Sequence, residues 1–171
     1  MKKVLAASAL LATLSACALL QSPPAPALND NELALPADYK SWPRFLPPVN
    51  RTDVKQIREI YVNPTGHSGS TREGGFPYGT QFVMEIYSAT PNADGTLAKG
   101  NLNKVFVMGK DKGWGVGAPE SLKNGEWIYS AYLPDGKPSG DNTGACRGCH
   151  LPLAPKDFVA RYDEYFDKRA K

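Results

Sequence analysis

Hydrophobic and polar residues alternate along four segments of the chain, and this alternation predicts β-strands. The segments 54–63 (VKQIREIYVN) and 79–88 (GTQFVMEIYS) are rich in β-branched and aromatic residues, and the segments 103–108 and 126–133 have a similar composition. Clusters of glycine, proline, asparagine and aspartate separate them, as the turns of an antiparallel sheet require. The pattern predicts a mainly β domain of the α+β class, built on an antiparallel meander.

Helical periodicity is confined to the edges of this domain. A short helix is expected at 36–42, and a second helix is expected at 157–169, where aromatic residues recur at helical spacing. The sequence shows no internal repeat, so a single sheet with short edge helices is the expected architecture.

The first 16 residues have the layout of a secretory signal peptide. Lys2 and Lys3 precede an uncharged apolar run from Val4 to Leu14, which is too short to span a bilayer, and small residues follow. The segment LSAC, which ends at Cys17, resembles a bacterial lipobox, and this resemblance implies that Cys17 is acylated. Ordinary signal cleavage beside Cys17 is the alternative. Both interpretations predict export to the periplasmic side of a bacterial membrane.

The rest of the chain divides into a proline-rich tether at 18–30 (ALLQSPPAPALND) and a domain at 31–171. With 42% hydrophobic and 22% charged residues, the 171-residue chain can bury one ordinary core. Once Lys2 and Lys3 are removed, 18 of the 20 basic residues remain against 17 acidic ones, a net charge of +1. So balanced a surface predicts no attraction to nucleic acid, and contact with a membrane through the lipid anchor only.

Cys146 and Cys149 are the cysteines left for the domain, and His150 follows them directly. This C-x-x-C-H pattern is typical of covalent haem c, in which each thiol forms a thioether and the imidazole ligates the iron. A zinc site would need two more good ligands, and the sequence has only one other histidine, His67. An oxidising compartment would also permit a disulfide between the two cysteines. One covalent haem is the interpretation that agrees with both motif and export.

The order of the segments carries a family resemblance. This resemblance rests on the segments IREIYVNP, FPYGTQFVMEIYS, VFVMG and EWIYSAYLPDG, which are followed by CRGCH. The chain resembles the cytochrome P-460 family and its sibling group, the β-sheet cytochromes c-prime (cytochrome c-prime-beta). The resemblance covers residues 29–168. It implies a monohaem c-type cytochrome in which an antiparallel sheet is followed by a haem-attachment loop and a C-terminal helix. It also implies association as a homodimer.

Met84 is where the chain departs from the enzymes of that family. It shares a strand face with Phe82, and in the P-460 enzymes the matching residue is a lysine that cross-links to the haem. A carboxylate that those enzymes use after the strand matching VFVMG has no clear counterpart here. Met84 either lines the pocket, as core packing, or supplies a sixth iron ligand. Met108 is a weaker candidate ligand, and His67 is expected in a flexible loop.

Arg58 shares a strand face with Ile60 and Val62, which is unusual for a charged residue unless it is paired or faces a cavity. The resemblance implies a place in the distal pocket, where guanidinium N–H groups hydrogen-bond an iron-bound ligand or a haem propionate. The alternative is that Ile57 and Tyr61 point into the core and Arg58 points away from it. Other candidate caps of the distal side are Phe76, Phe82 and Trp114.

Three functions remain open. The first is a cytochrome that binds a small ligand such as nitric oxide or serves in redox chemistry. The second is an electron carrier with His/Met ligation and a redox partner protein. The third is an enzyme that oxidises hydroxylamine or a related nitrogen compound, and methionine in place of the cross-linking lysine argues against it. The sequence indicates no catalytic residue.

Overall fold

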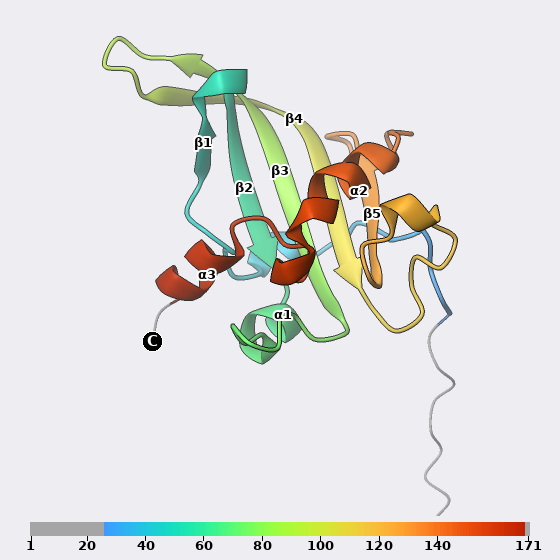
Figure 1. Cartoon of the computed structure of the whole chain (residues 1–171). Helices are drawn as coiled ribbons and strands as arrows, with labels where there is room; N and C mark the ends of the chain where they lie inside the picture. The colour runs from blue at the N-terminus through green and yellow to red at the C-terminus, as the bar shows by residue number, and fades with distance from the viewer. Residues whose placement is uncertain (1–25, 170–171) are drawn as a thin grey trace, which may run out of the picture.

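The computed structural model describes residues 26–169, and in this part of the chain five strands form one sheet (Figure 1). The strands are β1 (Val49–Arg51), β2 (Gln56–Val62), β3 (Thr80–Pro91), β4 (Leu97–Lys110) and β5 (Trp127–Tyr132). They lie in the order β1-β2-β3-β4-β5, and every neighbouring pair is antiparallel. The predicted mainly β meander is therefore confirmed. The signal peptide, Cys17 and most of the tether lie outside the described residues.

The β3–β4 hairpin is longer than predicted. It continues to Pro91 and resumes at Leu97, so the pairing extends into the predicted TPNADG turn, where Thr90 and Pro91 belong to β3. The Gly95 φ of 81° is one that glycine adopts without strain, and the backbone N–H of Asn92 bonds to the carbonyl of Thr96 at 2.8 Å. β1 was not predicted, because a three-residue edge strand is too short to show alternation.

Each face of the sheet carries its own hydrophobic cluster, because neighbouring residues on a strand point to opposite sides. One cluster includes Val62, Phe82, Met108, Trp127 and Tyr129. The other includes Tyr61, Val83, Val107, Ile128 and Tyr132. Each of the two interpretations of β2 is therefore correct for one face of the sheet. Val62 is buried on one face and Tyr61 is buried on the other.

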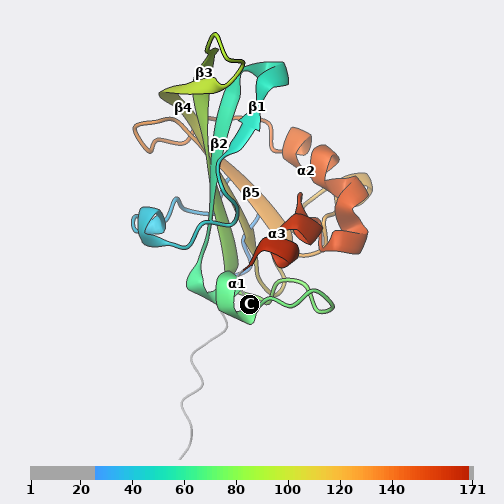
Figure 2. The ribbon, with the colours of Figure 1, turned by 90° about the vertical axis from the view of Figure 1, so that its left-hand side faces the viewer.

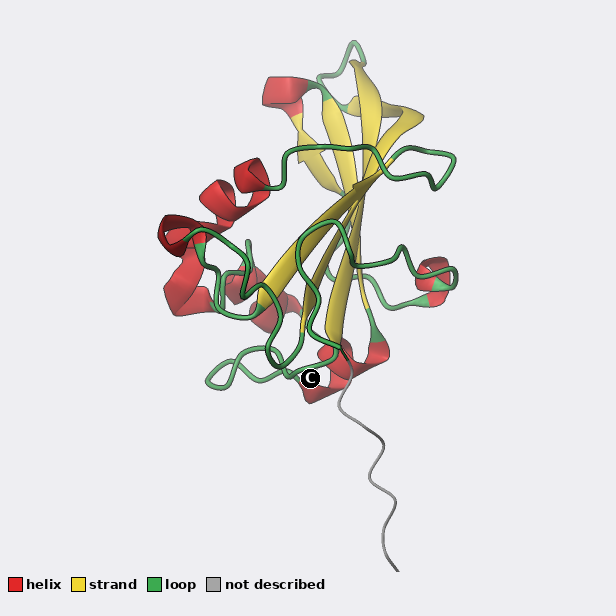
Figure 3. Ribbon diagram, turned by 90° about the vertical axis from the view of Figure 1, so that its right-hand side faces the viewer, coloured by secondary structure: helices red, strands yellow, loops and turns green. Residues whose placement is uncertain are grey.

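Different ends of the chain cover the two faces (Figures 2 and 3). The N-terminal segment packs Leu33 and Tyr39 onto the second cluster. The helices α2 (Gly144–His150) and α3 (Tyr162–Lys168), with the 3-10 helix Leu151–Lys156 between them, cover the first. No helix within residues 26–169 is long and apolar enough to cross a membrane.

The helical predictions need correction. In 36–42 only Tyr39–Ser41 is helical, as a 3-10 turn, because Pro43 disfavours helical conformation in the residue before it. In 157–169 the helix begins at Tyr162, since Asp157, Phe158 and Arg161 all have positive φ. The attachment segment, expected to be a loop, is the helix α2. Further 3-10 helices lie at Thr52–Val54 and Glu120–Leu122.

A helix also replaces the expected flexible loop around His67. This is α1 (Pro64–Gly69), which follows β2 directly. The side chain of Asn63 accepts a hydrogen bond from the backbone N–H of Gly66 at 3.0 Å, and Pro64 occupies the first helical position. Asn63 and Pro64 are the start signal that the sequence analysis missed.

Candidate haem site

The C-x-x-C-H motif lies on α2, in front of β4 and β5 (Figure 1). The helix brings Cys146, Cys149 and His150 to one short segment, because residues three and four apart share a helix face. Cys146 is half-buried and packs against the cluster that contains Phe82, whereas Cys149 is exposed. Neither thiol takes part in a disulfide in the structure. Burial raises the pKa of the Cys146 thiol, and the charge of Asp30 adds to this effect.

Arg147, inside the motif, anchors α2 to the rest of the domain. Its side chain is only 2% exposed and pairs with Asp30, with Nε–Oδ2 and Nη2–Oδ1 distances of 2.6 and 2.7 Å. Nη2 and Nη1 also donate to the carbonyls of Trp127 and Leu122. The Asn124 side chain donates to the Arg147 carbonyl at 3.2 Å. A buried charge needs such partners, and here they fix the position of the attachment helix.

Asp30 connects this anchor to the sheet as well. Its Oδ1 accepts the backbone N–H of Tyr129 at 3.1 Å, and the neighbouring Asn31 N–H bonds to the Tyr129 carbonyl at 2.8 Å. Leu28 packs against the second cluster. Residues 26–30 are the described end of the segment predicted to be a tether, and they therefore contribute to the folded domain.

The His150 ring has one nitrogen already engaged. Its Nδ1 lies 2.6 Å from the carbonyl oxygen of Phe158. A carbonyl can only accept, so Nδ1 carries the proton and Nε2 keeps its lone pair, the tautomer that ligates a metal through Nε2. Burial lowers the pKa of His150, against the opposing effect of this hydrogen bond, and the neutral form is favoured.

Asp157 holds the backbone that supplies this carbonyl. Its carboxylate accepts from the Phe76 N–H at 2.8 Å and the Trp127 Nε1–H at 3.2 Å, and it pairs with Lys110 at 2.9 Å. Asp157 and Phe158 have φ values of 49° and 58°, a left-handed conformation that non-glycine residues adopt at some cost. The carboxylate contacts stabilise that turn and so direct the Phe158 carbonyl toward the imidazole.

The sheet face that carries the Phe82 cluster also carries a half-buried apolar row. The register of β2, β3, β4 and β5 aligns Ile60, Met84, Phe106 and Ala131 across the sheet. Three of them, Ile60, Met84 and Phe106, are only partly covered. The next row contains Arg58, Ile86 and Lys104. Lys104 is paired with Asp141 at 2.6 Å, and Arg58 donates to the side-chain oxygen of Gln56. An apolar strip beside Arg58 therefore suits a flat apolar molecule with an acidic group at that edge.

Two buried polar atoms on this face have no partner among the described residues. They are Nε of Arg58 and the hydroxyl of Tyr129. Burial lowers the pKa of Arg58, and the nearby Arg51 lowers it further. The Tyr129 ring lies 5.2 Å from the His150 ring, and burial raises the pKa of its hydroxyl. Buried polar groups in native proteins are nearly always hydrogen-bonded to protein, water or a ligand, so these two atoms can each take a further partner on this face, as can the side-chain oxygens of Asn124, Ser130 and Ser139 elsewhere.

The other candidate residues occupy varied positions. Phe76, Phe82 and Met108 are 1%, 6% and 8% exposed within the cluster on this face, as core side chains. Trp114 belongs to the cluster on the opposite face, so the proposal that it caps the distal side is wrong. His67 lies in α1, where its Nδ1 is 3.3 Å from the Tyr165 hydroxyl.

A comparison with protein-family models supplies the decisive finding. The model described as Cytochrome P460 matches residues 36–161, most of the chain. The chain belongs to the cytochrome P460 family. Membership implies a haem cofactor. A comparison with curated proteins gave no match.

The residues of this cytochrome P460 family member fit a haem. The structure supplies a neutral imidazole with a free Nε2, two free thiols on the same helix, an apolar strip and two orphaned polar atoms. Within residues 26–169 no group of three or more His, Cys, Asp or Glu side chains is placed to hold a metal ion alone. The ligand role of His150 and the pocket roles of Arg58, Phe82 and Met84 stay predictions.

Sequence reasoning missed four residues of this site. Asp30 lies in a segment without periodicity and Asp157 lies at the start of the predicted helix, and the partners of both are far away in the chain. Arg147 occupies a variable position of the motif, where nothing in the sequence distinguishes a buried arginine from an exposed one. The alternation of β5 places Tyr129 on one face, but does not reveal that its hydroxyl lacks a partner.

Proposed function

We propose that this protein is an exported monohaem c-type cytochrome that binds a small ligand such as nitric oxide or takes part in redox chemistry. The supporting observation is α2, which holds Cys146, Cys149 and His150 together with the imidazole Nδ1 engaged by the Phe158 carbonyl. The two cysteines would bind one haem through thioethers, and Nε2 of His150 would be the proximal ligand. Haem iron, when bound, supplies a site for a diatomic gas or for the exchange of one electron.

The residues on the sheet face determine which small molecules can enter. Ile60, Met84 and Phe106 make the strip apolar, which disfavours charged or strongly hydrated ligands. Arg58 carries a buried N–H without a partner, able to donate a hydrogen bond to a ligand or to a haem propionate. Met84 cannot form the amine cross-link of the P-460 enzymes. These features support small-ligand binding over hydroxylamine oxidation.

Electron transfer is the second candidate, and the position of Met84 favours it. Its side chain is only partly covered and lies on the sheet face to which Cys146 packs. A thioether opposite His150 would give the ligand pair that raises the reduction potential and suits a carrier with a redox partner protein.

We also propose acylation of Cys17, attachment to the periplasmic side of a bacterial membrane, and a homodimer. The first two rest on the sequence from Met1 to Cys17. The dimer is supported by the β3–β4 hairpin, which extends beyond the pairing of β2 with Ser88 and of β5 with Val105 and leaves strand edges uncovered (Figure 1). Light scattering that detects only monomers at micromolar concentration would contradict the dimer.

Mass spectrometry tests the central proposal. Protein produced together with a haem-attachment system should carry the mass of one haem, and the mass should persist after denaturation in organic solvent. Cys146→Ser and Cys149→Ser should each remove one thioether, and the double variant should carry no covalent haem. A wild-type chain with the unmodified mass, in cells that attach haem to a control cytochrome, would refute the proposal.

A further inference from the structure

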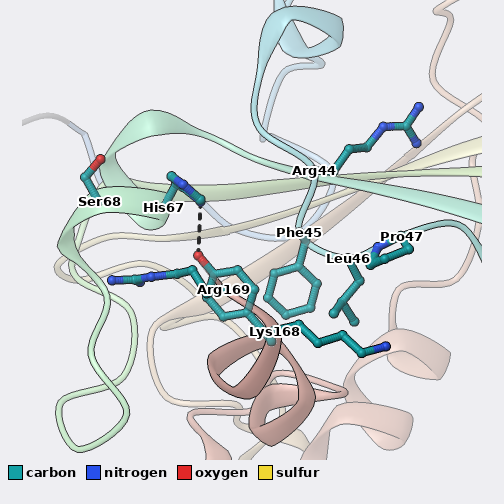
Figure 4. A pocket seen from close by; sticks show the side chains of 9 residues that line it. Arg44, Phe45, Leu46, Pro47, His67, Ser68, Lys168 and Arg169 are labelled. Carbon is teal, nitrogen blue, oxygen red and sulfur yellow. Dashed lines mark hydrogen bonds between the residues drawn. The ribbon is translucent and has the colours of Figure 1, made fainter. Parts of the chain in front are cut away.

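A hollow lies between the segment 44–47, α1 and the end of α3, away from the attachment helix (Figure 4). Its volume is about 510 Å³. Phe45 and Tyr165 stack at its floor, with ring centroids 4.4 Å apart and planes inclined by 23°. No residue of the C-x-x-C-H motif lines it. We call this hollow the α1–α3 pocket.

The lining of the α1–α3 pocket is positively charged and contains no acidic residue. Its basic members are Arg44, His67, Lys168 and Arg169. Arg44 and Lys168 each pair with a carboxylate outside the lining, Glu59 at 3.1 Å and Glu164 at 2.8 Å. Within the described chain Arg169 has no carboxylate partner. Among residues 26–169, the charge of Arg169 is therefore not offset by a carboxylate.

Arg169 is held in place by uncharged partners. Its Nη1 donates to the carbonyl and hydroxyl oxygens of Ser70, at 2.9 and 2.8 Å, and Ser70 is only 1% exposed. The guanidinium lies 5.8 Å from the centroid of Tyr165 and 5.6 Å from that of Phe166. Nε and Nη2 have no acceptor among residues 26–169. A fixed guanidinium with free donors is prepared to bind an anion at low entropic cost.

We propose that the α1–α3 pocket binds an organic anion: a molecule with a flat apolar body and a carboxylate, sulfonate or phosphate group. The acidic group would accept hydrogen bonds from Arg169, and the apolar body would contact the exposed ring of Pro47 and the edges of the stacked rings of Phe45 and Tyr165, which are 4% and 1% exposed. A volume of about 510 Å³ is within the range of small-molecule sites and exceeds what an inorganic anion fills. The proposal is independent of the haem and of the function proposed above.

Calorimetry with two matched probes tests this proposal. Naphthalene-2-carboxylate and naphthalene-2-carboxamide have the same flat body, but only the first is charged. The full-length protein should bind the carboxylate about tenfold more tightly than the amide, since a charged hydrogen bond contributes roughly that factor to Kd. Added salt should reduce this preference. Equal affinities for the two probes would overturn the proposal without any variant.

Two substitutions locate the site. Arg169→Gln keeps a donor for Ser70 but removes the charge, so it should abolish the preference for the carboxylate. Lys168→Gln, at a side chain 57% exposed, should weaken carboxylate binding about two- to threefold and keeps the test valid if Arg169→Gln disturbs the fold. Lys137→Gln makes the same charge change at a side chain 79% exposed outside the pocket and should change nothing. An unchanged preference in both pocket variants would show that the probe binds elsewhere and would overturn the assignment.

Discussion

Asp30→Ala should destabilise the domain by removing the carboxylate that pairs with Arg147 in the described part of the chain. The guanidinium is 2% exposed and would keep two carbonyl contacts, to Trp127 and Leu122, with no negative charge beside it. The backbone N–H of Tyr129 would also lose its acceptor, the Asp30 carboxylate. The substitution therefore leaves a buried cation only partly satisfied.

The structure sets the size of this effect. Breaking a buried ion pair by deleting one partner costs about 3–5 kcal/mol of unfolding free energy. Asp30 is 17% exposed, so water can reach part of the site, and we expect the lower end, about 3 kcal/mol. With a urea m-value of about 2 kcal/mol/M, the midpoint should fall by about 1.5 M.

Urea denaturation followed by tryptophan fluorescence measures this loss. The double variant Asp30→Ala/Arg147→Met should regain most of the stability, because replacing both charges by apolar groups is often near neutral. Asp135→Ala, which breaks the exposed pair with Lys137, should shift the midpoint little. The reasoning would be refuted if the urea midpoint of Asp30→Ala decreased by less than about 0.5 M, or if the double variant were less stable than the single one.

Three further predictions concern other parts of the molecule. Burial acts to raise the pKa of Glu85, but hydrogen bonds from Tyr39 and Tyr87, together with the charge of Lys40, outweigh it and hold the pKa below 4.5. This stabilisation is present above pH 4.5 and is lost as the pH falls, so Glu85→Gln should flatten the stability profile below about pH 4.5. An unchanged slope in acid titrations followed by circular dichroism would contradict this. If Met84 only lines the pocket, Met84→Ala should leave the resting spin state in optical and resonance Raman spectra unchanged, whereas a change from low to high spin would assign Met84 as sixth ligand. Asp157→Asn should weaken the Lys110 contact that holds the Phe158 turn, so the iron–histidine vibration of the ferrous protein should shift; a vibration unchanged from wild type would show that the turn holds without the charge.

The sheet was predictable from the sequence because alternation is a local signal. Each of the four predicted strands is present, since residues two apart face the same cluster and turn residues separate the runs. The motif was equally visible, because C-x-x-C-H is contiguous in sequence. What the pattern could not supply was the coverage of each face, which decides whether an alternating residue such as Tyr61 or Val62 is buried.

The remainder of the site depends on contacts between distant segments. Asp30 and Arg147 are separated by 117 positions, and Lys110 and Asp157 by 47. Positive φ at Asp157 and Phe158 depends on these contacts rather than on local propensity, so a helix was wrongly predicted to begin there. For the same reason Trp114, an aromatic residue in a glycine-rich segment, could not be assigned to a face.

The arrangement of α2 indicates that the geometry of the motif is a property of the whole fold. A helix of seven residues is unstable in isolation, because its few hydrogen bonds do not offset the cost of nucleation. Here Arg147 and Asn124 anchor it to β5, the N-terminal segment and a neighbouring loop, and Phe158 orients its last side chain. Because Asp30 pairs with Arg147, a chain that begins at residue 31 would lack this ion pair, although it would keep every residue of the motif. The contiguous motif therefore specifies the chemistry of the site, and contacts from both ends of the domain fix its position.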